Sequence, residues 1–532
     1  MTTMSLSNGS PNIHTVTAGD PPFLFHRGEG YTRHRLPVGT DVIYAHPPLP
    51  GLPDRRGATE NALDHPLGTE PFNAHLRAGM KVTIAFDDVS LPLPRMKRPD
   101  IRQTVMEVVL ERLDRAGVTD IELICAICLH RRCTPAELEH FVGAAIFKRF
   151  WPTRLYNHDA EDSNGNLYLG TTTKGEVVEI NRRAAESDLL IYVNINLVTM
   201  DGGHKSVPVG LATYRCVRHH HNARTMLHDS SYMDPPRSDF HRSCERMGDI
   251  VAKKVKIFTI ETTLNGDLFS SMLGFLQNRE QAWNVRDRLT YHGSRIGLSL
   301  LPSSLRRKVY NALPAPYGLT GVHAGSTGHV HRETLRNVDR QAEVEVPRQL
   351  DIMLVGLPSI GPYNVNSILN PILVYCLSAG YFFNFYRSRP LVRKGGVMII
   401  DHPLTDEFQL VHHPSYYDFY RDLLPQTRDP KELEHRFEKS YAENSRYIDL
   451  YRHSYAYHGV HPFYMWYWGA HGIAHLGKVI VVNPKSHEAA RRIGFDMAPS
   501  MNAAIGMAKD YVGRDASICY FHCPPMIMCK LP

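Results

Sequence analysis

The sequence lacks the features of membrane and nucleic-acid-binding proteins. It contains no apolar run of about 18 residues, which is the length that a membrane-spanning helix requires. Its net charge of +6 comes from 60 basic and 54 acidic residues spread along the chain, without a polybasic arm. Residues 1–20 have neither the basic nor the apolar region of a standard secretory signal. We therefore expect a cytoplasmic protein with a small-molecule partner, and neither nucleic acid nor membrane.

Two nucleotide-binding motifs are also missing. No Gly-x-Gly-x-x-Gly follows a predicted strand, so a standard dinucleotide site has no support. The run from Thr171 to Gly175 resembles part of a phosphate loop, but it lacks the Walker spacing of glycine, lysine and hydroxyl residues. A nucleoside-triphosphatase is therefore not indicated.

The cysteines do not form the pattern of a zinc site or of a disulfide framework. Cys125, Cys128, His130 and Cys133 are closely spaced, but no second Cys-x-x-Cys pair completes a tetrahedral set. The chain has nine cysteines, an odd number, and several lie in apolar runs. We expect buried, reduced thiols.

What the sequence does contain is an alternation of strands and helices. Strands are predicted at 80–86, 121–129 and 189–197, and again at 351–356, 396–401, 478–483 and 517–521. A helix is predicted from about Asp100 to Ala116, and Thr134-Pro-Ala-Glu137 is a capping box that opens another. This order is typical of an α/β fold with parallel-type sheets.

The predicted organisation has two α/β domains with the active site in the cleft between them. Residues 1–40 are expected to be a disordered extension, 41–340 an N-terminal α/β domain, and 341–532 a Rossmann-like C-terminal α/β domain. The C-terminal domain carries a long insertion at about 403–475 that is rich in aromatic residues and histidine. The segment 255–345 gives no clear pattern.

Chemically active residues follow three of the predicted strands. Asp88, His130 and Lys205 each come just past a strand end, and ligands of parallel sheets gather at the carboxyl ends of strands. Lys205 ends a Gly202-Gly-His-Lys turn, and a histidine cluster, His219 to His221, follows it. Glycines allow close approach of a ligand, lysine supplies an amine, and histidine supplies a soft nitrogen donor. These residues predict a ligand site at one edge, although a solvated His-rich tract is an equally plausible interpretation of the cluster.

Taken in order, the motifs resemble those of the nickel-dependent lactate racemase family from about residue 45 onward. The matching pieces are Pro47-Pro48, Asn61-Ala-Leu-Asp-His-Pro-Leu-Gly-Thr-Glu-Pro71, Asp88, His130-Arg131, Asn157-His-Asp159, Gly170-Thr-Thr-Thr-Lys-Gly175, Ile180-Asn-Arg182, Gly202-Gly-His-Lys205, Gly210 and His221-Asn222. The ordered series is specific, whereas no single piece of it would be.

The resemblance implies a nickel-pincer nucleotide, a pyridinium mononucleotide with thioamide and thiocarboxylate groups that carries nickel. Lys205 matches the lysine that joins the cofactor as a thioamide, and His221 matches the nickel ligand. Asp88, Gly202 and Gly203 are expected beside the cofactor, and His130 matches the first acid/base histidine. In the implied reaction the C2 hydrogen leaves as hydride to the cofactor while a histidine takes the hydroxyl proton. Cofactor-synthesis and nickel-insertion proteins are the implied partners.

The sequence departs from the family at substrate-handling positions. Leu91 stands where the racemases have an arginine, and leucine cannot contact a carboxylate bidentately. Ile195, flanked by Asn194 and Asn196, falls where the second acid/base histidine is expected. Ile368-Leu369-Asn-Pro-Ile372 replaces a Tyr-Gln-x-x-Lys signature in the second domain. The replacement base is sought among the remaining histidines: His204, His323, His329 and His331.

Three functions fit a chain that keeps the residues matched to the cofactor but lacks several that handle the substrate. The favoured one is a racemase or epimerase, an isomerase of a 2-hydroxy acid larger than lactate or of a sugar acid, with the aromatic insertion shaping its pocket. The second is a one-base redox enzyme that uses the same cofactor. The third is a protein that binds or carries the nickel cofactor without turnover.

Overall fold

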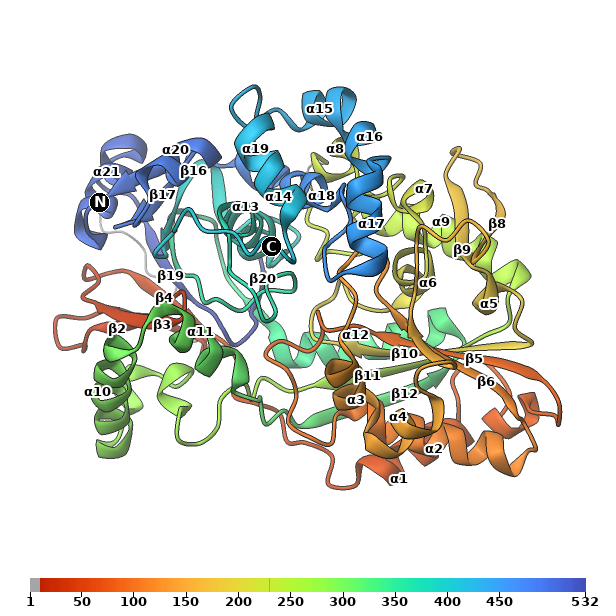
Figure 1. Cartoon of the computed structure of the whole chain (residues 1–532). Coiled ribbons are helices and arrows are strands. Elements are labelled where there is room, and N and C mark those ends of the chain that lie inside the picture. Colours follow the sequence, from red (N-terminus) through yellow and green to blue (C-terminus); the bar gives the residue numbers. More distant parts are fainter. Residues whose placement is uncertain (1–9, 229) are drawn as a thin grey trace.

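Two large sheets form the framework of the molecule. The structure is a computed structural model that describes residues 10–228 and 230–532. Figure 1 shows the two sheets side by side, with strands from the middle of the chain in one and strands from both its early and late parts in the other. The expected α/β fold with parallel-type sheets is confirmed, and the observed strands begin and end within a few residues of the predicted ranges.

The first sheet has the strand order β12-β11-β10-β5-β6-β7. Its strands are β5 (Lys81–Asp87), β6 (Asp120–Ala126), β7 (Leu155–Asn157), β10 (Leu189–Asn196), β11 (Ile257–Leu264) and β12 (Leu319–Gly325). Every residue of β10 is buried, which is the pattern of a parallel strand covered on both faces. The strands run parallel except β12, which pairs antiparallel with β11.

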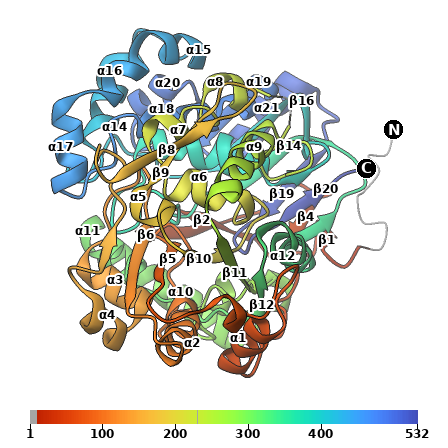
Figure 2. The ribbon, with the colours of Figure 1, turned by 90° about the vertical axis from the view of Figure 1, so that its right-hand side faces the viewer.

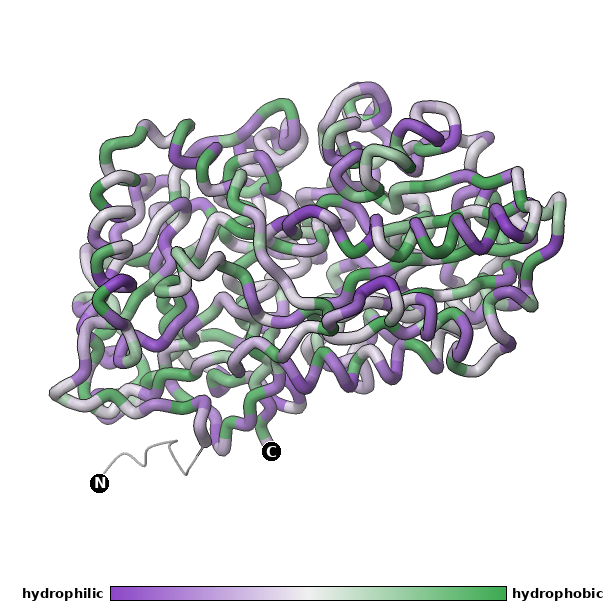
Figure 3. Tube along the Cα trace, turned by 90° about the horizontal axis from the view of Figure 1, so that it is seen from below, coloured by the Kyte–Doolittle hydropathy of each residue, from purple (hydrophilic) through white to green (hydrophobic). Residues whose placement is uncertain are grey.

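Amphipathic helices cover the two faces of this sheet. Figures 1 and 2 show α1 (Arg55–Asp64), α2 (Ile101–Arg115) and α4 (Ala144–Phe150) below it, and α6 (Ser206–Gly210) and α9 (Asp239–Lys254) above it. Seen from below, the helical coils alternate between hydrophobic and hydrophilic residues (Figure 3). Helices α1 and α2 contact strands of the sheet, whereas α6 and α9 pack on each other. The predicted helix at 100–116 is confirmed as α2, with Asp100 as its N-cap.

The remaining helices of this half are short or lie at its border. They are α3 (Pro135–Val142), α5 (Arg182–Ala185), α7 (Tyr214–Val217), α8 (Ala223–Met226), α10 (Val285–Leu300), α11 (Ser303–Ala312) and α12 (Thr327–Ala342). The hairpin of β8 (Asn166–Thr171) and β9 (Val177–Asn181) packs on α9. The segment that gave no clear pattern in the sequence thus contains two strands and three helices between Ile257 and Ala342.

The second sheet has the order β1-β4-β19-β14-β16-β17-β18. Its strands are β1 (Ile13–Thr15), β4 (Asp41–Tyr44), β14 (Leu350–Gly356), β16 (Val392–Asp401), β17 (Lys478–Val482), β18 (Asp496–Ala498) and β19 (Ile518–His522). Strands β16, β17 and β18 follow β14 on one side, whereas β19 lies on the other. The strand order therefore reverses between β14 and β19, where the crevice of an open α/β sheet binds ligands.

The expectation of a disordered N-terminal extension is wrong for residues 10–40, and residues 1–9 lie outside the described part. The hairpin of β2 (Phe23–Arg27) and β3 (Gly30–His34) precedes β4, and β4 pairs with β19 in parallel. Phe23 and Phe25 are buried in the core of the second sheet, and Phe25 stacks on Tyr520 at 3.9 Å between ring centroids. These apolar side chains order a segment that is otherwise polar.

The aromatic-rich insertion is helical and lies between the two halves (Figure 1). It contains α14 (Pro414–Asp418), α15 (Pro430–Leu433), α16 (Lys439–Ala442), α17 (Ser445–His453), α18 (His461–Trp468) and α19 (Ala470–His475). All residues of α18 are buried. The second half is completed by α13 (Pro371–Tyr375), α20 (His487–Ile493), α21 (Met501–Val512) and a small sheet of β13 (Glu343–Glu345), β15 (Tyr386–Arg387) and β20 (Met528–Lys530).

No helix within residues 10–228 and 230–532 combines the length and the hydrophobicity that a membrane crossing requires.

Candidate active site

A cavity of about 170 Å³ lies where the carboxyl ends of strands from both sheets meet. We call it the lysine cavity. It is lined by residues that follow β5, β6 and β10, by residues that follow β14 and β19, and by Trp468 of the insertion. Its polar and aromatic lining residues include Ser90, His130, Asp201, Lys205, His221, Phe240, Tyr363, Tyr381, Phe382, Phe385 and Trp468. Three distant parts of the chain therefore build one site.

His130 and Asp88 form a hydrogen-bonded pair in the lysine cavity. His130 Nδ1 lies 2.7 Å from Asp88 Oδ2, and the other carboxylate oxygen accepts bonds from the amide and the hydroxyl of Ser90. Burial alone would raise the pKa of Asp88, but the charge and hydrogen bond of His130 and the bonds from Ser90 hold it below its usual value. The carboxylate accepts Nδ1–H, so Nε2 is the ring nitrogen left free of Asp88 to exchange a proton.

A buried arginine fixes the loop that carries Asp88. Arg102 lies in the first turn of α2, and its guanidinium donates to the carbonyl oxygens of Asp87 at 2.6 Å and Asp88 at 2.9 Å. The same guanidinium pairs with the N-cap carboxylate of Asp100 at 2.9 Å. The start of α2 thus holds the end of β5, so the position of Asp88 is set by the helix packed beneath it.

The two glycines before Lys205 adopt left-handed backbone conformations, with φ of 75° at Gly202 and 64° at Gly203. A Cβ at position 202 would lie 2.5 Å from a carboxylate oxygen of Glu261, which itself accepts the amide of Gly203 at 2.7 Å. Side chains larger than hydrogen are therefore excluded at this turn. The turn leads into α6 and places Lys205 at the cavity wall, with 17% of its side chain exposed.

Two carboxyl groups, Asp201 and Asp87, interact with the charge of Lys205. Asp201 Oδ1 is 4.0 Å from Nζ, and Asp201 Oδ2 accepts the amides of Leu197 and Val198 at 3.0 and 3.1 Å. Burial raises the pKa of Asp201, with the charge of Lys205 opposing it. Burial also raises the pKa of Asp87 to about 7, although this carboxylate accepts the amide of Ile195. Both groups can hold a proton released by the lysine.

His220 fixes the tautomer of His221. His220 Nε2 lies 3.3 Å from the carbonyl oxygen of Pro208, which can only accept, so this nitrogen carries the hydrogen. The Nδ1 atoms of the two histidines are 2.7 Å apart, so His221 must donate to His220. Burial lowers the pKa of both imidazoles, to about 4 for His220, and keeps them neutral. His221 Nε2 therefore keeps its lone pair.

Aromatic rings from the insertion surround His221. Trp468 stacks on it with ring centroids 5.0 Å apart and an interplanar angle of 24°, and Tyr464 lies at 5.3 Å. On the other side of the cavity Tyr363 lies 5.2 Å from the ring of His130, and its hydroxyl is 3.0 Å from that of Tyr381. Sequence reasoning predicted an aromatic insertion near the site but did not single out Trp468, Tyr363 or Tyr381.

The four histidines proposed from the sequence as a replacement base do not line the lysine cavity. His204 points toward α9 and α12, since Cβ atoms built at Gly248 and Gly328 would lie 2.8 and 3.7 Å from its side chain. His331 binds Glu261 at 3.1 Å, His323 binds Asn337 at 2.9 Å, and His329 binds Ser326 at 2.9 Å. The catalytic assignment of His204 therefore gains no support from its position.

The asparagines that flank Ile195 are also engaged elsewhere. Asn194 donates to Asp87 at 3.0 Å and accepts the Ser206 hydroxyl at 2.9 Å, while Asn196 donates to the carbonyl oxygen of Thr262 at 3.3 Å. His130 is thus the histidine at the cavity wall whose environment suits proton transfer, and Tyr363 and Tyr381 supply neutral hydroxyl groups beside it.

The cysteines are buried free thiols, as the sequence predicted. Cys125 and Cys133 lie 3.7 Å apart between sulfur atoms, and burial raises the pKa of both Cys125 and Cys128. Within the described residues, no three His, Cys, Asp or Glu side chains form a metal-binding group by themselves.

Comparisons with known proteins place this site in a family context. Residues 28–234 match the lactate racemase N-terminal domain. The chain is 27% identical to the lactate racemase of Lactiplantibacillus plantarum over 191 residues, which are 33% of this chain and 42% of that protein. It is 23% identical to the lactate racemase of Thermoanaerobacterium thermosaccharolyticum over 167 residues, 30% of this chain and 37% of that protein. The matched regions thus span less than half of either relative.

The likeness of the folds extends further than that of the sequences. The structure of the lactate racemase apoprotein from Thermoanaerobacterium thermosaccharolyticum aligns with 96% of this chain and 100% of that chain, with a TM-score of 0.60 and 16% identity. The shared fold therefore covers both sheets.

Proposed function

Because this chain is a divergent member of the lactate racemase family, we propose that it inverts C2 of a 2-hydroxy acid in the lysine cavity. The observation that carries the proposal is the presence of His130, Lys205 and His221 on the wall of one cavity, with His130 held by Asp88. A general base, an amine and a neutral imidazole thus face the same space.

The residues of the lysine cavity fit a covalently attached nickel-pincer nucleotide. The Lys205 amine would attach the cofactor covalently and the lone pair of His221 Nε2 would bind its nickel, since imidazole suits nickel(II). The apolar and aromatic lining suits a flat, partly apolar ring. When bound, the cofactor supplies the acceptor for the C2 hydrogen.

The chain's own residues supply proton transfer and orientation. His130 Nε2 accepts the proton of the substrate hydroxyl while Asp88 stabilises the imidazolium that forms. Asp201, 4.0 Å from the Lys205 amine, would accept the proton that the amine gives up when the cofactor is attached. Trp468 stacks on His221 and excludes water from that side. Leu91 lines the cavity where the resemblance predicts an arginine, so a carboxylate group must be bound by other residues.

A one-base redox enzyme on the same cofactor is the second candidate function. It is favoured because His204, His323, His329 and His331 do not line the cavity, so none of the four histidines considered from the sequence is placed to act as a second base there. A racemase would then have to use Tyr363 or Tyr381 as the other proton donor. A cofactor carrier without turnover remains the third candidate.

One experiment separates these candidates. The protein is produced together with cofactor-synthesis and nickel-insertion proteins, and intact mass, nickel content and the inversion of single-enantiomer 2-hydroxy acids are measured. We expect a mass adduct that Lys205→Ala abolishes, about one nickel per chain, and inversion that falls by roughly 10²- to 10⁴-fold in His130→Gln while the adduct stays. His329→Ala is the matched control and should leave the adduct, the nickel content and the inversion rate unchanged.

The outcomes distinguish the three functions. Absence of both the adduct and nickel would contradict all three candidate functions. Adduct and nickel without inversion, but with oxidation of the hydroxy acid when a second ketone is added to take up the hydride, would support the redox enzyme. Adduct and nickel with neither product would support the carrier. In deuterated water, inversion without deuterium at C2 is expected, and extensive exchange at C2 would contradict an internal return of the hydrogen.

A further inference from the structure

A cavity of about 260 Å³ lies beside the β2–β3 hairpin. We call it the hairpin cavity. Its walls come from the turn of the hairpin, from the start of α11 and from the loops that follow β14, β16 and β17. Figure 1 shows α11 next to this hairpin at the border of the second sheet. Because ligands of parallel sheets gather at the carboxyl ends of strands, the position suits a binding site.

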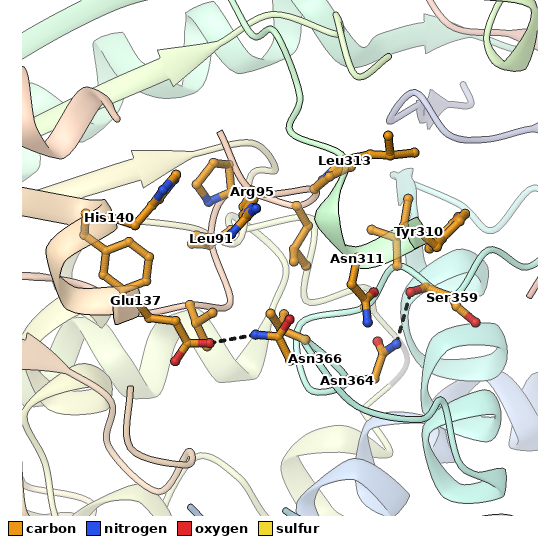
Figure 4. Close-up of a pocket in the computed structure, with 18 of the residues that line it drawn as sticks. Leu91, Arg95, Glu137, His140, Tyr310, Asn311, Leu313, Ser359, Asn364 and Asn366 are labelled. Atoms are coloured by element: carbon orange, nitrogen blue, oxygen red, sulfur yellow. Dashed lines mark hydrogen bonds between the residues drawn. The ribbon is translucent and has the colours of Figure 1, made fainter. Parts of the chain in front are cut away.

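The hairpin cavity is separate from the lysine cavity, and the two linings have no residue in common. Pro358 and Ile360 line the lysine cavity, whereas Ser359 between them lines the hairpin cavity. Ser359 also borders a third cavity, of about 230 Å³, which the end of α11 lines (Figure 4). There its carbonyl oxygen accepts the amide of Asn364 at 3.1 Å, so its hydroxyl is the group that it can offer to a ligand.

The acidic residues in the wall of the hairpin cavity already face a cation. Arg307 on α11 pairs with Glu29 of the hairpin turn at 3.0 Å and with Glu407 after β16 at 3.6 Å. Arg27 pairs with Asp401 at the end of β16. These ion pairs hold the hairpin, α11 and the loop after β16 together, so the cavity has a built wall.

Two further cations of the lining, Arg306 on α11 and Lys485 after β17, have no carboxylate partner within residues 10–228 and 230–532. The first turn of α11 adds to their positive field. Ser303, its first residue, lines the cavity, and Pro302 at the N-cap offers no side-chain cap to the free amides. Uncapped amides at a helix N-terminus attract anions. The free charges of this wall are therefore all positive.

Two buried donors of the same wall lack a partner within the described part of the chain. His402 is 3% exposed, and its Nδ1 accepts the amide of Leu404 at 3.0 Å. Burial lowers the pKa of His402 to about 3, so the neutral ring carries its hydrogen on Nε2, which is left without a protein acceptor. The hydroxyl of Ser359, 5% exposed, is likewise unbound. Buried polar groups rarely lack hydrogen bonds, so both donors need a ligand or ordered water.

The chemistry of these groups restricts the ligand. A guanidinium, an ammonium, helix amides, an imidazole N–H and a hydroxyl can all donate, so the ligand must accept several hydrogen bonds and carry negative charge. A phosphate monoester offers three acceptor oxygens and nearly two charges, more than one carboxylate does. The cavity is larger than a bare phosphate requires, and Tyr31, Ile368, Leu369 and Pro403 add apolar surface to it. An organic group attached to the phosphate fills this remaining space.

We infer that the hairpin cavity binds the phosphate monoester of a small organic molecule. Arg306, Lys485 and the first amides of α11 attract the phosphate, and the side chains of His402 and Ser359 donate to it. The apolar part of the lining contacts the organic group. This site does not depend on the proposed function, because it shares no lining residue with the lysine cavity.

The test is calorimetry of the full chain in phosphate-free buffer. The probes are glycerol 3-phosphate, ribose 5-phosphate and phenyl phosphate, with inorganic phosphate and the dicarboxylate glutarate for comparison. We expect at least one ester to bind about tenfold more tightly than inorganic phosphate or glutarate, because only the ester supplies both the phosphate and an organic group. Binding of no ester, or of glutarate as tightly as the best ester, would overturn the inference.

Variants place the ester in the hairpin cavity. Arg306→Gln and Lys485→Gln should each weaken the best ester about tenfold, the value of a hydrogen bond to a charged group, and Ser359→Ala about threefold. Lys394→Gln is the matched control, an exposed lysine near the opposite end of β16, and should leave the affinity unchanged. Urea unfolding of each variant checks that the fold is intact.

Lys205→Ala separates the hairpin cavity from the lysine cavity, and it should bind the ester as the unmodified protein does. Loss of binding in Lys205→Ala but not in Arg306→Gln would place the ester in the lysine cavity and overturn the inference. Equal affinity in Arg306→Gln, Lys485→Gln and the unmodified protein would overturn it as well, because the ester would then bind elsewhere. These measurements need no loaded cofactor, so failure of the proposed function would not affect their outcome.

Discussion

At the residue scale, His220 determines which ring nitrogen of His221 carries the hydrogen. His220 donates to a backbone carbonyl and must therefore accept from His221, which leaves the outer nitrogen of His221 unprotonated. Partners of this kind orient metal-ligating histidines, and their loss typically lowers metal affinity 10- to 100-fold. His220 is fully buried, so it acts through His221 and does not touch the cavity.

We predict that His220→Phe lowers nickel retention by about 10- to 100-fold while the mass adduct on Lys205 still forms. The ring shape is kept, but the acceptor that fixes the tautomer of His221 is lost. Nickel content after dialysis against a chelator measures the effect, with His219→Phe as the neighbouring control. Retention equal to that of the unmodified protein would show that His221 does not need its partner.

The predicted site residues that the structure brings to one edge are those whose position local structure sets, and their catalytic roles stay predictions. Asp88, His130 and Lys205 follow strands, so the parallel sheet alone brings them to one edge. Trp468 and Tyr363 come from distant segments, and no local pattern could indicate that they reach the same cavity. His204 directly precedes Lys205, but successive side chains of a tight 3₁₀ turn point to different sides.

At the element scale, side-chain caps stabilise the first turn of α3. The Thr134 hydroxyl accepts the amide of Glu137 at 3.2 Å, and the Glu137 carboxylate accepts the amide of Thr134 at 2.8 Å. This capping box was predicted from the sequence and is confirmed. Because Glu137 also binds Arg131 and Asn366, the start of α3 ties the first sheet to the loop after β14.

We predict that Thr134→Ala lowers the free energy of unfolding by about 1 kcal/mol, the usual cost of losing an N-cap side chain. Urea unfolding followed by circular dichroism measures it. Thr134→Ser keeps the hydroxyl and should stay within a few tenths of a kcal/mol of the unmodified protein. Equal destabilisation by serine and alanine would assign the effect to the lost methyl group instead.

Strands and helices were predictable where their periodicity was strong, and not elsewhere. The buried run of β10 and the one-sided apolar face of α2 are patterns that burial on a sheet produces. In contrast, α10 and α11, which bury few residues, were not predicted. The β2–β3 hairpin is short, and its contacts with residues far along the chain, such as Glu280, Asp401 and Tyr520, order it.

At the scale of the whole molecule, a buried glutamate joins the insertion to the first half. Glu438 is 2% exposed and accepts hydrogen bonds from Tyr467 at 2.9 Å and from Tyr214 on α7 at 3.1 Å. Burial raises its pKa to about 7, with the bond from Tyr467 opposing the shift. The folded protein therefore holds a proton at this site more tightly than the unfolded chain does.

We predict that this group makes the protein less stable as the pH rises. A raised pKa in the folded state gives stability that is complete below the unfolded value near 4.5 and is lost as the pH rises through about 7. Glu438→Gln removes the titration, so between pH 5 and 8 it should gain on the order of 2 kcal/mol relative to the unmodified protein. Urea midpoints at each pH test this, and two parallel stability curves would contradict it.

The place of β19 in the second sheet affects how the chain can fold while it is being synthesised. This strand comes near the end of the chain, yet it lies between β4 and β14. During synthesis, all strands of the first sheet are available once β12 has left the ribosome. At that point β19, the parallel neighbour of β4, has not yet been synthesised. The edges of β4 and β14 then stay open to other chains until β19 arrives, so nascent chains are most prone to wrong pairing between the synthesis of β14 and that of β19.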